Sequence, residues 1–257
     1  DKTVLDDRRL RWKEAVRNAS FKLHTDRTKY AAESWRSTVG EDIQIRRAKL
    51  FKHIAENVDI DILEYDYIVG RIGPTILGNY TSIDICGDYL DGLWDDTGEL
   101  QITLHDQTAC SPEDLEILRD CVRTFRGQNP VDCIKKTWRE ILGDWPDDSL
   151  EAHIKDPDLT SGNFGNSSNT IDFEIILNKG LKYYIEEATR RMEEFKANFG
   201  QQPDQFLFWR SAVIVCQACI DHAKRYAALA RKKAETEKDE KRRAELLDIA
   251  ETCEYVP

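Results

Sequence analysis

The sequence predicts a mainly α fold, and three observations carry this prediction. Apolar residues recur every three or four positions along most of the 257 residues, the spacing of an amphipathic helix. Residues that favour helix starts stand before two of these stretches, at Asp26 and at Ser111. Alternating runs typical of strands are scarce, and Tyr67–Val69, ended by a glycine, is the one short β-type run that we expect.

Three helices are expected before this run. Leu5–Ala19 is short and rich in arginine, and Asp26–Trp35 has Asp26 as its N-cap. The third is Glu41–Val58, in which the apolar residues that share one face are Ile43, Leu50, Phe51, Ile54 and Val58.

The middle of the chain is expected to alternate between turns and helices. Arg71–Asp88 is rich in glycine turns and forms a loop. Ser111 is the N-cap of a helix that ends near Phe125, since proline follows it and an acidic residue lies three positions on. Val131–Leu142 is a further helix, and Asp156–Thr170 is a second long loop.

Two long helices follow. Phe173–Phe195 has apolar residues at three- and four-residue spacing and presents one apolar face. The second helix, Asp204–Glu235, is apolar on nearly all sides over Phe206–Ile220, so we expect that part to be buried in a larger body. Arg231–Arg243 is a charge run that predicts a solvated face, and Ala244–Tyr255 begins another helix.

Composition excludes several classes of partner. The net charge of −11 argues against nucleic acid and against an anionic membrane, because both would repel the chain. No apolar stretch is long enough to span a bilayer, and no signal peptide opens the chain, which begins at Asp1. Seven irregularly spaced cysteines indicate reduced thiols in a cytoplasmic protein.

The motifs of most catalytic and metal sites do not occur in the sequence. Cys216 and Cys219 form a Cys-x-x-Cys pair, which is either a redox or metal site or two small buried residues on an apolar helix. The five histidines lie far apart, so no metal site is expected. No phosphate loop or nucleophile elbow is present, and acidic pairs lie in turns. Motifs alone therefore predict a helical protein without an active site.

The order of several segments adds a resemblance to a known family. Gly40–Gly70 contains an Ile-x-x-x-Glu-x-Asp-x-Ile-Val-Gly run, and Ser111–Gln128 opens Ser-Pro-Glu-Asp. Phe173–Met192 contains Lys-Gly-Leu, Phe208–Ala234 begins with an aromatic pair, and Arg242–Pro257 follows them. These segments resemble, in the same order, the amino-terminal segments of glycyl radical enzymes.

The resemblance implies that residues 1–257 are the amino-terminal helical portion of the ten-stranded α/β-barrel fold of these enzymes. The family's chemistry needs a cysteine in a Cys-x-Glu loop and a glycine in an Arg-Val-x-Gly-Tyr-like loop, and neither pattern occurs here. We therefore expect no catalytic residue in this chain, which is a fragment and inactive alone. A non-catalytic helical interaction module remains an alternative.

The resemblance also implies the cofactors and partners of the full-length enzyme. Its glycyl radical is installed by a separate S-adenosylmethionine-dependent iron–sulfur activase in the cytoplasm of an anaerobe. The further partners are the remainder of the polypeptide and, in a homodimer, a second copy.

Within the family, Lys22–Thr38 and Tyr80–Asp96 are most similar to the arylacetate decarboxylase branch. Members of that branch convert indole-3-acetate, 4-hydroxyphenylacetate or phenylacetate to the methylarene and CO₂. The substrate implied is a small aromatic acid. The alternatives within the family are a diol or hydroxyproline dehydratase and an arylsuccinate synthase.

The resemblance places substrate-binding residues on the helix that begins with the aromatic pair. Residues four apart share a helix face, so Trp209, Val213 and Gln217 form a stripe that Phe208 flanks. In isethionate-type relatives the first two positions are Arg and Gln, and in choline-type relatives the first and third are an aromatic residue and Asp. Apolar residues at the first two positions here suit an aromatic ring, and Gln217 can hydrogen-bond a polar group. The alternative is that all are core residues.

Overall fold

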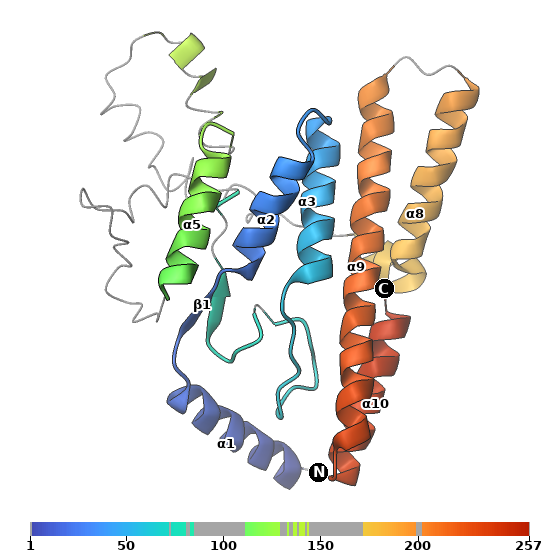
Figure 1. The fold of residues 1–257 in the computed structure, drawn as a ribbon. Helices are drawn as coiled ribbons and strands as arrows, with labels where there is room; N and C mark the ends of the chain where they lie inside the picture. Colours follow the sequence, from blue (N-terminus) through green and yellow to red (C-terminus); the bar gives the residue numbers. More distant parts are fainter. Residues whose placement is uncertain are drawn as a thin grey trace.

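The computed structural model describes residues 2–71, 73–80, 83–84, 111–128, 172–198 and 202–256, with isolated residues between 133 and 143. These residues are mainly helical, which confirms the predicted class (Figure 1). The helices are α1 (Lys2–Asn18), α2 (Asp26–Ser37), α3 (Ile43–Asn57), α5 (Pro112–Phe125), α8 (Phe173–Ala197), α9 (Pro203–Thr236) and α10 (Glu240–Tyr255). The strands are β1 (Lys22–His24) and β2 (Gly78–Tyr80).

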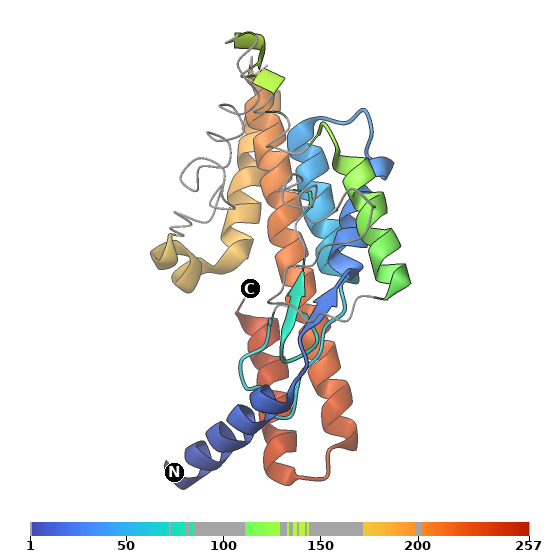
Figure 2. The same cartoon turned by 90° about the vertical axis from the view of Figure 1, so that its left-hand side faces the viewer.

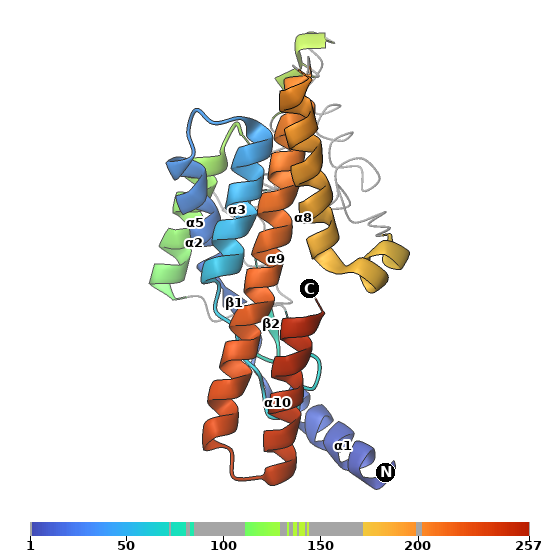
Figure 3. The same ribbon diagram turned by 90° about the vertical axis from the view of Figure 1, so that its right-hand side faces the viewer.

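Helix α9 organises the arrangement. It runs beside α3 on one side and beside α8 and α10 on the other, and α2 and α5 extend the α3 side (Figures 1 and 3). Helix α1 projects from the foot of the molecule, close to α10 (Figure 2). Within the part of the chain that the structure describes, no helix is long and apolar enough to cross a membrane.

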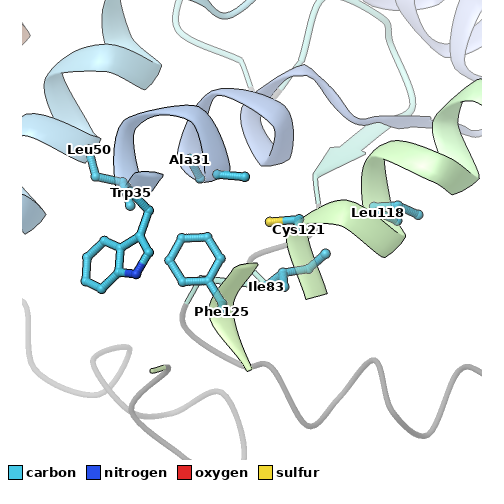
Figure 4. Packing of buried hydrophobic residues seen from close by; sticks show 8 residues of the cluster. Ala31, Trp35, Leu50, Ile83, Leu118, Cys121 and Phe125 are labelled. Carbon is cyan, nitrogen blue, oxygen red and sulfur yellow. The ribbon is translucent and has the colours of Figure 1, made fainter. Parts of the chain in front are cut away.

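A first core joins α2, α3 and α5 (Figure 4). Trp35 and Phe125 stack at its centre, and the other members are Ala31, Ala32, Leu50, Ile83, Leu118 and Cys121. The Trp35 indole nitrogen donates to Gln128 Oε1 at 3.0 Å, which satisfies its one polar atom. The Arg46 guanidinium lies 3.7 Å from the ring centroid and covers the indole.

A second core joins the loop after α3 to the hairpin of α9 and α10. Its members are Ile62, Tyr226, Ala227, Ala230, Ala234, Leu246, Ile249 and Ala250. The small alanine side chains of α9 let α10 approach closely. The charged side chains around them hydrogen-bond the loop after α3. Lys233 donates to the carbonyl of Ile62, and Arg242 donates to those of Leu63 and Asp66.

These contacts correct the expectation for Arg231–Arg243. The run is not one solvated face, because it spans the turn between α9 and α10 and two of its cations bind loop carbonyls. Arg231, by contrast, forms an exposed pair with Glu254, as a solvated charge does.

The strands also differ from the prediction. The segment Tyr67–Val69 is irregular and forms no strand. Tyr67 and Ile68 are exposed, because they do not pack against a sheet. The sheet is instead a parallel pair in which Lys22 is opposite Gly78 and His24 is opposite Tyr80. A strand of three residues is too short to show the alternation of apolar and polar residues by which strands are recognised in a sequence.

The predicted capping is confirmed at the start of α5 and is wrong at the start of α2. The box at Ser111 is confirmed: its hydroxyl accepts from the Asp114 amide, and the Asp114 side chain accepts from the Ser111 amide. At α2 the N-cap is Thr25 and not Asp26. The Thr25 hydroxyl donates to Asp114 Oδ1 at 2.8 Å, while Asp26 accepts from the Asp59 amide. Both side chains thus serve tertiary contacts.

Helix α8 is not one straight helix with one apolar face. Gly180 has φ +67° and ψ −177°, a conformation that glycine adopts far more readily than other residues. The part before it, which includes Phe173 and Leu177, turns away and leaves both side chains exposed (Figure 3). The expected loop Asp156–Thr170 lies outside the described residues, as does half of Val131–Leu142, whose described residues are helical. Most of the expected loop Arg71–Asp88 is described, and it is irregular there except at β2.

Candidate functional site

The first half of α9 carries the predicted substrate stripe of Trp209, Val213 and Gln217, and Phe208 lies on another side of the helix. Trp209 is half-buried and meets Phe195 of α8 edge to face, with ring centroids 6.1 Å apart. Val213, one turn further on, is also half-buried. Phe208 is 60% exposed and lies about 100° around the helix from Trp209. Of the four residues, Phe208 is therefore the one that lies apart from the stripe.

Gln217 is exposed and forms a hydrogen bond within its own helix. Its amide nitrogen donates to Asp221 Oδ1 at 3.0 Å. The side chain lies one turn beyond Val213, so an apolar surface ends at a polar pair. We did not predict this hydrogen bond from the sequence. The separation of four residues between Gln217 and Asp221 is the signal that could have indicated it.

The segment Phe206–Ile220 is less buried than a core helix. Ala218 and Ile220 are buried, whereas most of the other residues are only partly covered. This partial exposure agrees with the expectation that the segment is buried only in a larger body. A helix that is apolar on several sides and still exposed is a surface that needs a further partner.

A shallow apolar groove runs between α3 and α9. It encloses about 450 Å³ and is lined by Ile43, Gln44, Arg47, Ala48, Phe51, Ser211 and Val215. Ile43 and Phe51 were expected to share one apolar face with Leu50, but both are substantially exposed whereas Leu50 is buried. The correction follows from the packing, because α3 buries Leu50 against α2 and turns Ile43 and Phe51 towards this groove.

A buried carboxylate lies close to the groove. Asp84 is 2% exposed, and Arg27 donates to its Oδ1 at 2.8 Å. Arg47 donates to the Asp84 carbonyl at 3.1 Å, and burial lowers the pKa of its guanidinium. The cluster fixes the segment around residue 84 to α2 and α3, and it is a structural element that sequence motifs did not reveal.

The Cys-x-x-Cys pair is explained by packing. Cys216 and Cys219 are free and half-buried, and burial raises the pKa of both thiols. Protonated thiols are poor nucleophiles and poor metal ligands, which favours the interpretation as small buried residues. Over the residues that the structure describes, no group of three or more His, Cys, Asp or Glu side chains could hold a metal ion.

The described residues form a helical body with partly exposed apolar surfaces. A sequence model described as pyruvate formate lyase-like matches residues 6–257. The chain belongs to this family of glycyl radical enzymes.

Individual relatives agree with this assignment. An isethionate sulfite-lyase of Nitratidesulfovibrio vulgaris is 30% identical over 95% of this chain, which spans 30% of that protein's length. A structure concerning 1,2-propanediol dehydration in Roseburia inulinivorans matches with a TM-score of 0.79 and 26% identity over 98% of this chain and 29% of its own. The glycerol-bound glycerol dehydratase of Clostridium butyricum matches with a TM-score of 0.74 and 27% identity over 97% of this chain and 31% of its own.

Proposed function

We propose that the protein is the amino-terminal part of a glycyl radical lyase that eliminates a small leaving group, such as water, from a hydroxylated substrate. The observation that carries this proposal is the end of the stripe on α9, where the apolar Trp209 and Val213 give way to the neutral amide of Gln217. The named relatives include a sulfite-lyase and two proteins of diol or glycerol dehydration, which supports elimination.

Trp209, Val213 and Gln217 would contact different parts of the substrate. Trp209 and Val213 would contact the carbon skeleton, and Gln217 would hydrogen-bond a polar substituent. Neither Trp209 nor Val213 resembles the Arg and Gln that isethionate-type enzymes carry at these positions. A sulfonate would thus find no cation on this stripe. Phe208 would contribute at most to the edge, since it lies on another side of α9.

Decarboxylation of an arylacetate is the second candidate. It is favoured by the aromatic cluster at the start of the stripe, where Phe195 lies 5.7 Å from Phe206 and 6.1 Å from Trp209 between ring centroids. Aromatic pairs contribute about 0.5–1.5 kcal/mol beyond area burial, so such a cluster can hold a ring. The relatives named above favour elimination instead, and they support the dehydratase alternative better than the arylacetate branch.

The chemistry itself would be supplied from outside this chain. Residues 1–257 contain no Cys-x-Glu pattern, and we propose that the rest of the polypeptide carries the cysteine and the glycyl radical. A separate S-adenosylmethionine-dependent activase would install the radical in the cytoplasm of an anaerobe, and the full-length enzyme would be a homodimer. The isolated chain would be inactive.

The test is an anaerobic assay of the full-length protein with a radical-installing activase. The substrates are propane-1,2-diol, glycerol, trans-4-hydroxyproline and isethionate, beside phenylacetate, 4-hydroxyphenylacetate and indole-3-acetate. We expect turnover of a hydroxylated compound. Loss of CO₂ from an arylacetate would favour the second candidate, and a protein that acquires no radical and turns over nothing would favour a helical interaction module.

A further inference from the structure

Helices α3 and α9 lie side by side and run in the same direction (Figures 1 and 3). Near the starts of both helices, the side-chain nitrogen of Gln44 lies 3.5 Å from the carbonyl oxygen of Asp204. Near the end of α3, His222 Nδ1 lies 2.8 Å from the carbonyl oxygen of Ala55. These contacts fix the spacing of the two helices, and the apolar groove of about 450 Å³ lies alongside them.

The two walls of this groove are largely apolar and follow helical spacing. Ile43 and Phe51 lie on α3 with Ala48 between them, and they are 54% and 41% exposed. Ser211 and Val215 lie about one turn apart on α9, and the Ser211 hydroxyl already donates to a carbonyl of its own helix at 2.7 Å. Walls of this kind on two neighbouring helices form a groove into which the apolar face of an amphipathic helix packs.

Among the described residues that line the groove, Arg47 is the one that carries a charge. Its Nη1 donates to the Asp84 carbonyl at 3.1 Å and lies 3.8 Å from Asp84 Oδ2. These contacts engage one of the three guanidinium nitrogens, so Nε and Nη2 can still donate. Burial lowers the pKa of this guanidinium, and a further acceptor at the groove would stabilise its charged form.

We propose that this groove holds an amphipathic helix from the part of the polypeptide that follows Pro257, with its apolar face between α3 and α9 and an acceptor opposite Arg47. The chain spans 30% of the length of the isethionate sulfite-lyase that it matches, so most of such a protein lies outside residues 1–257. The inference rests on the proposed function only in requiring that the polypeptide continues, and it holds whichever substrate is used.

A second copy of the chain fits the groove less well. A stable interface between separate proteins takes about 20–30 residues from each partner, whereas seven described residues line this groove. A segment of the same polypeptide needs no interface of that size, because tethering gives it an effective concentration of about a millimolar or more.

The first part of the test measures access to the groove in the full-length protein before radical installation. Iodoacetamide labelling, read peptide by peptide by mass spectrometry, compares Ile43→Cys and Phe51→Cys with the matched control Lys52→Cys. The three positions lie on one helix and are similarly exposed here, at 54%, 41% and 47% (side chain only for Lys52). Thermal unfolding checks that each variant is folded. We expect Ile43→Cys and Phe51→Cys to react at least about tenfold more slowly than Lys52→Cys, because the helix must first detach.

The second part identifies the occupant by photo-crosslinking from p-benzoylphenylalanine placed at position 51, with position 52 as the control. A crosslink within one polypeptide, from position 51 to a peptide beyond Pro257, supports the inference. Equal labelling of the three thiols overturns it, as does a crosslink to a second copy or to a peptide within residues 1–257. Failure of the proposed function has a different signature, namely a radical-loaded wild type that turns over no hydroxylated substrate.

Discussion

The rings of Trp35 and Phe125 lie 5.2 Å apart between centroids and are inclined by 39°, and this contact joins α2 to α5 across 90 residues of sequence. Both side chains are almost completely buried. The contact fixes the position of α2, and through Leu50 that of α3, which in turn lies against α9. The surface that carries the candidate site is therefore supported by this core.

Truncation at this contact is expected to destabilise the protein strongly. Phe125→Ala should lower the free energy of unfolding by about 3–5 kcal/mol, because it leaves a cavity in a close-packed core. Phe208→Ala is the matched control, since the same change at an exposed position should cost less than about 0.5 kcal/mol. Urea unfolding of both variants measures the difference, and equal losses would show that the described core is not where stability resides.

The buried carboxylate gives a second stability prediction. Asp84→Ala breaks the ion pair between this almost fully buried carboxylate and Arg27, so we expect a loss of about 3–5 kcal/mol. Asp120→Ala breaks the exposed pair with Arg36 and should cost at most about 1 kcal/mol. Chemical denaturation distinguishes the two, and a small effect of Asp84→Ala would mean that solvent reaches this cluster.

The pH dependence of stability should carry a contribution from His24. Its Nε2 lies 2.9 Å from Thr75 Oγ1, and burial lowers the pKa of the imidazole below its ordinary value. The nearby Lys22 also lowers this pKa, while three carboxylates oppose the shift, those of Asp26, Asp59 and Asp114.

The direction of the effect follows from proton binding. A lowered pKa means that the unfolded chain binds the proton more tightly than the folded one. His24 therefore favours the folded state above a pH of about 6.5, and this contribution is lost as the pH falls below that value. Melting temperatures from pH 8 to pH 5 should fall less steeply in His24→Gln than in the wild type. Parallel curves would contradict the prediction.

Two glycines with similar positive φ angles test the packing around that histidine. Gly73 and Gly127 have φ of +77° and +74°, so alanine is strained at both by about 1–2 kcal/mol. A Cβ at Gly73 would lie 2.8 Å from the His24 ring, whereas one at Gly127 meets open space. Gly73→Ala should therefore be the more destabilising by thermal unfolding, and an equal loss would show that strain alone matters.

Helix positions and the capping box could be read from the sequence because they depend on local patterns. The spacing of apolar residues located α9, and Ser111 with its acidic partner three residues on located the start of α5. The kink at Gly180 was missed, since glycine within a helical pattern is often tolerated.

Features that depend on contacts between distant parts of the sequence were harder to predict from the sequence. The pairing of Lys22–His24 with Gly78–Tyr80 joins segments more than 50 residues apart, and each strand is too short for a pattern. The ion pair of Arg27 with Asp84 also joins residues that are far apart in the sequence, so no local pattern predicts it. At the candidate site, spacing gave the stripe on α9, but it could not show that Phe195 covers Trp209 or that Gln217 pairs with Asp221.

The contact with Phe195 changes what a truncation of Trp209 should do. Trp209→Ala removes both the ring that we place against the substrate and an edge-to-face contact with α8. We expect a raised KM together with a loss of about 1–3 kcal/mol in stability. Trp209→Phe should keep most of the stability and most of the affinity, and kinetics beside thermal unfolding of the full-length protein check both.

The measurement that tests the central claim most directly is made on Gln217→Leu in the activated full-length enzyme. Gln217 is exposed, so the change should leave the melting temperature within about 1 °C of the wild type. If α9 faces the substrate, kcat/KM for a hydroxylated substrate should fall about tenfold or more, because one hydrogen bond is lost. An unchanged kcat/KM in a stable variant would contradict the account and place the substrate elsewhere.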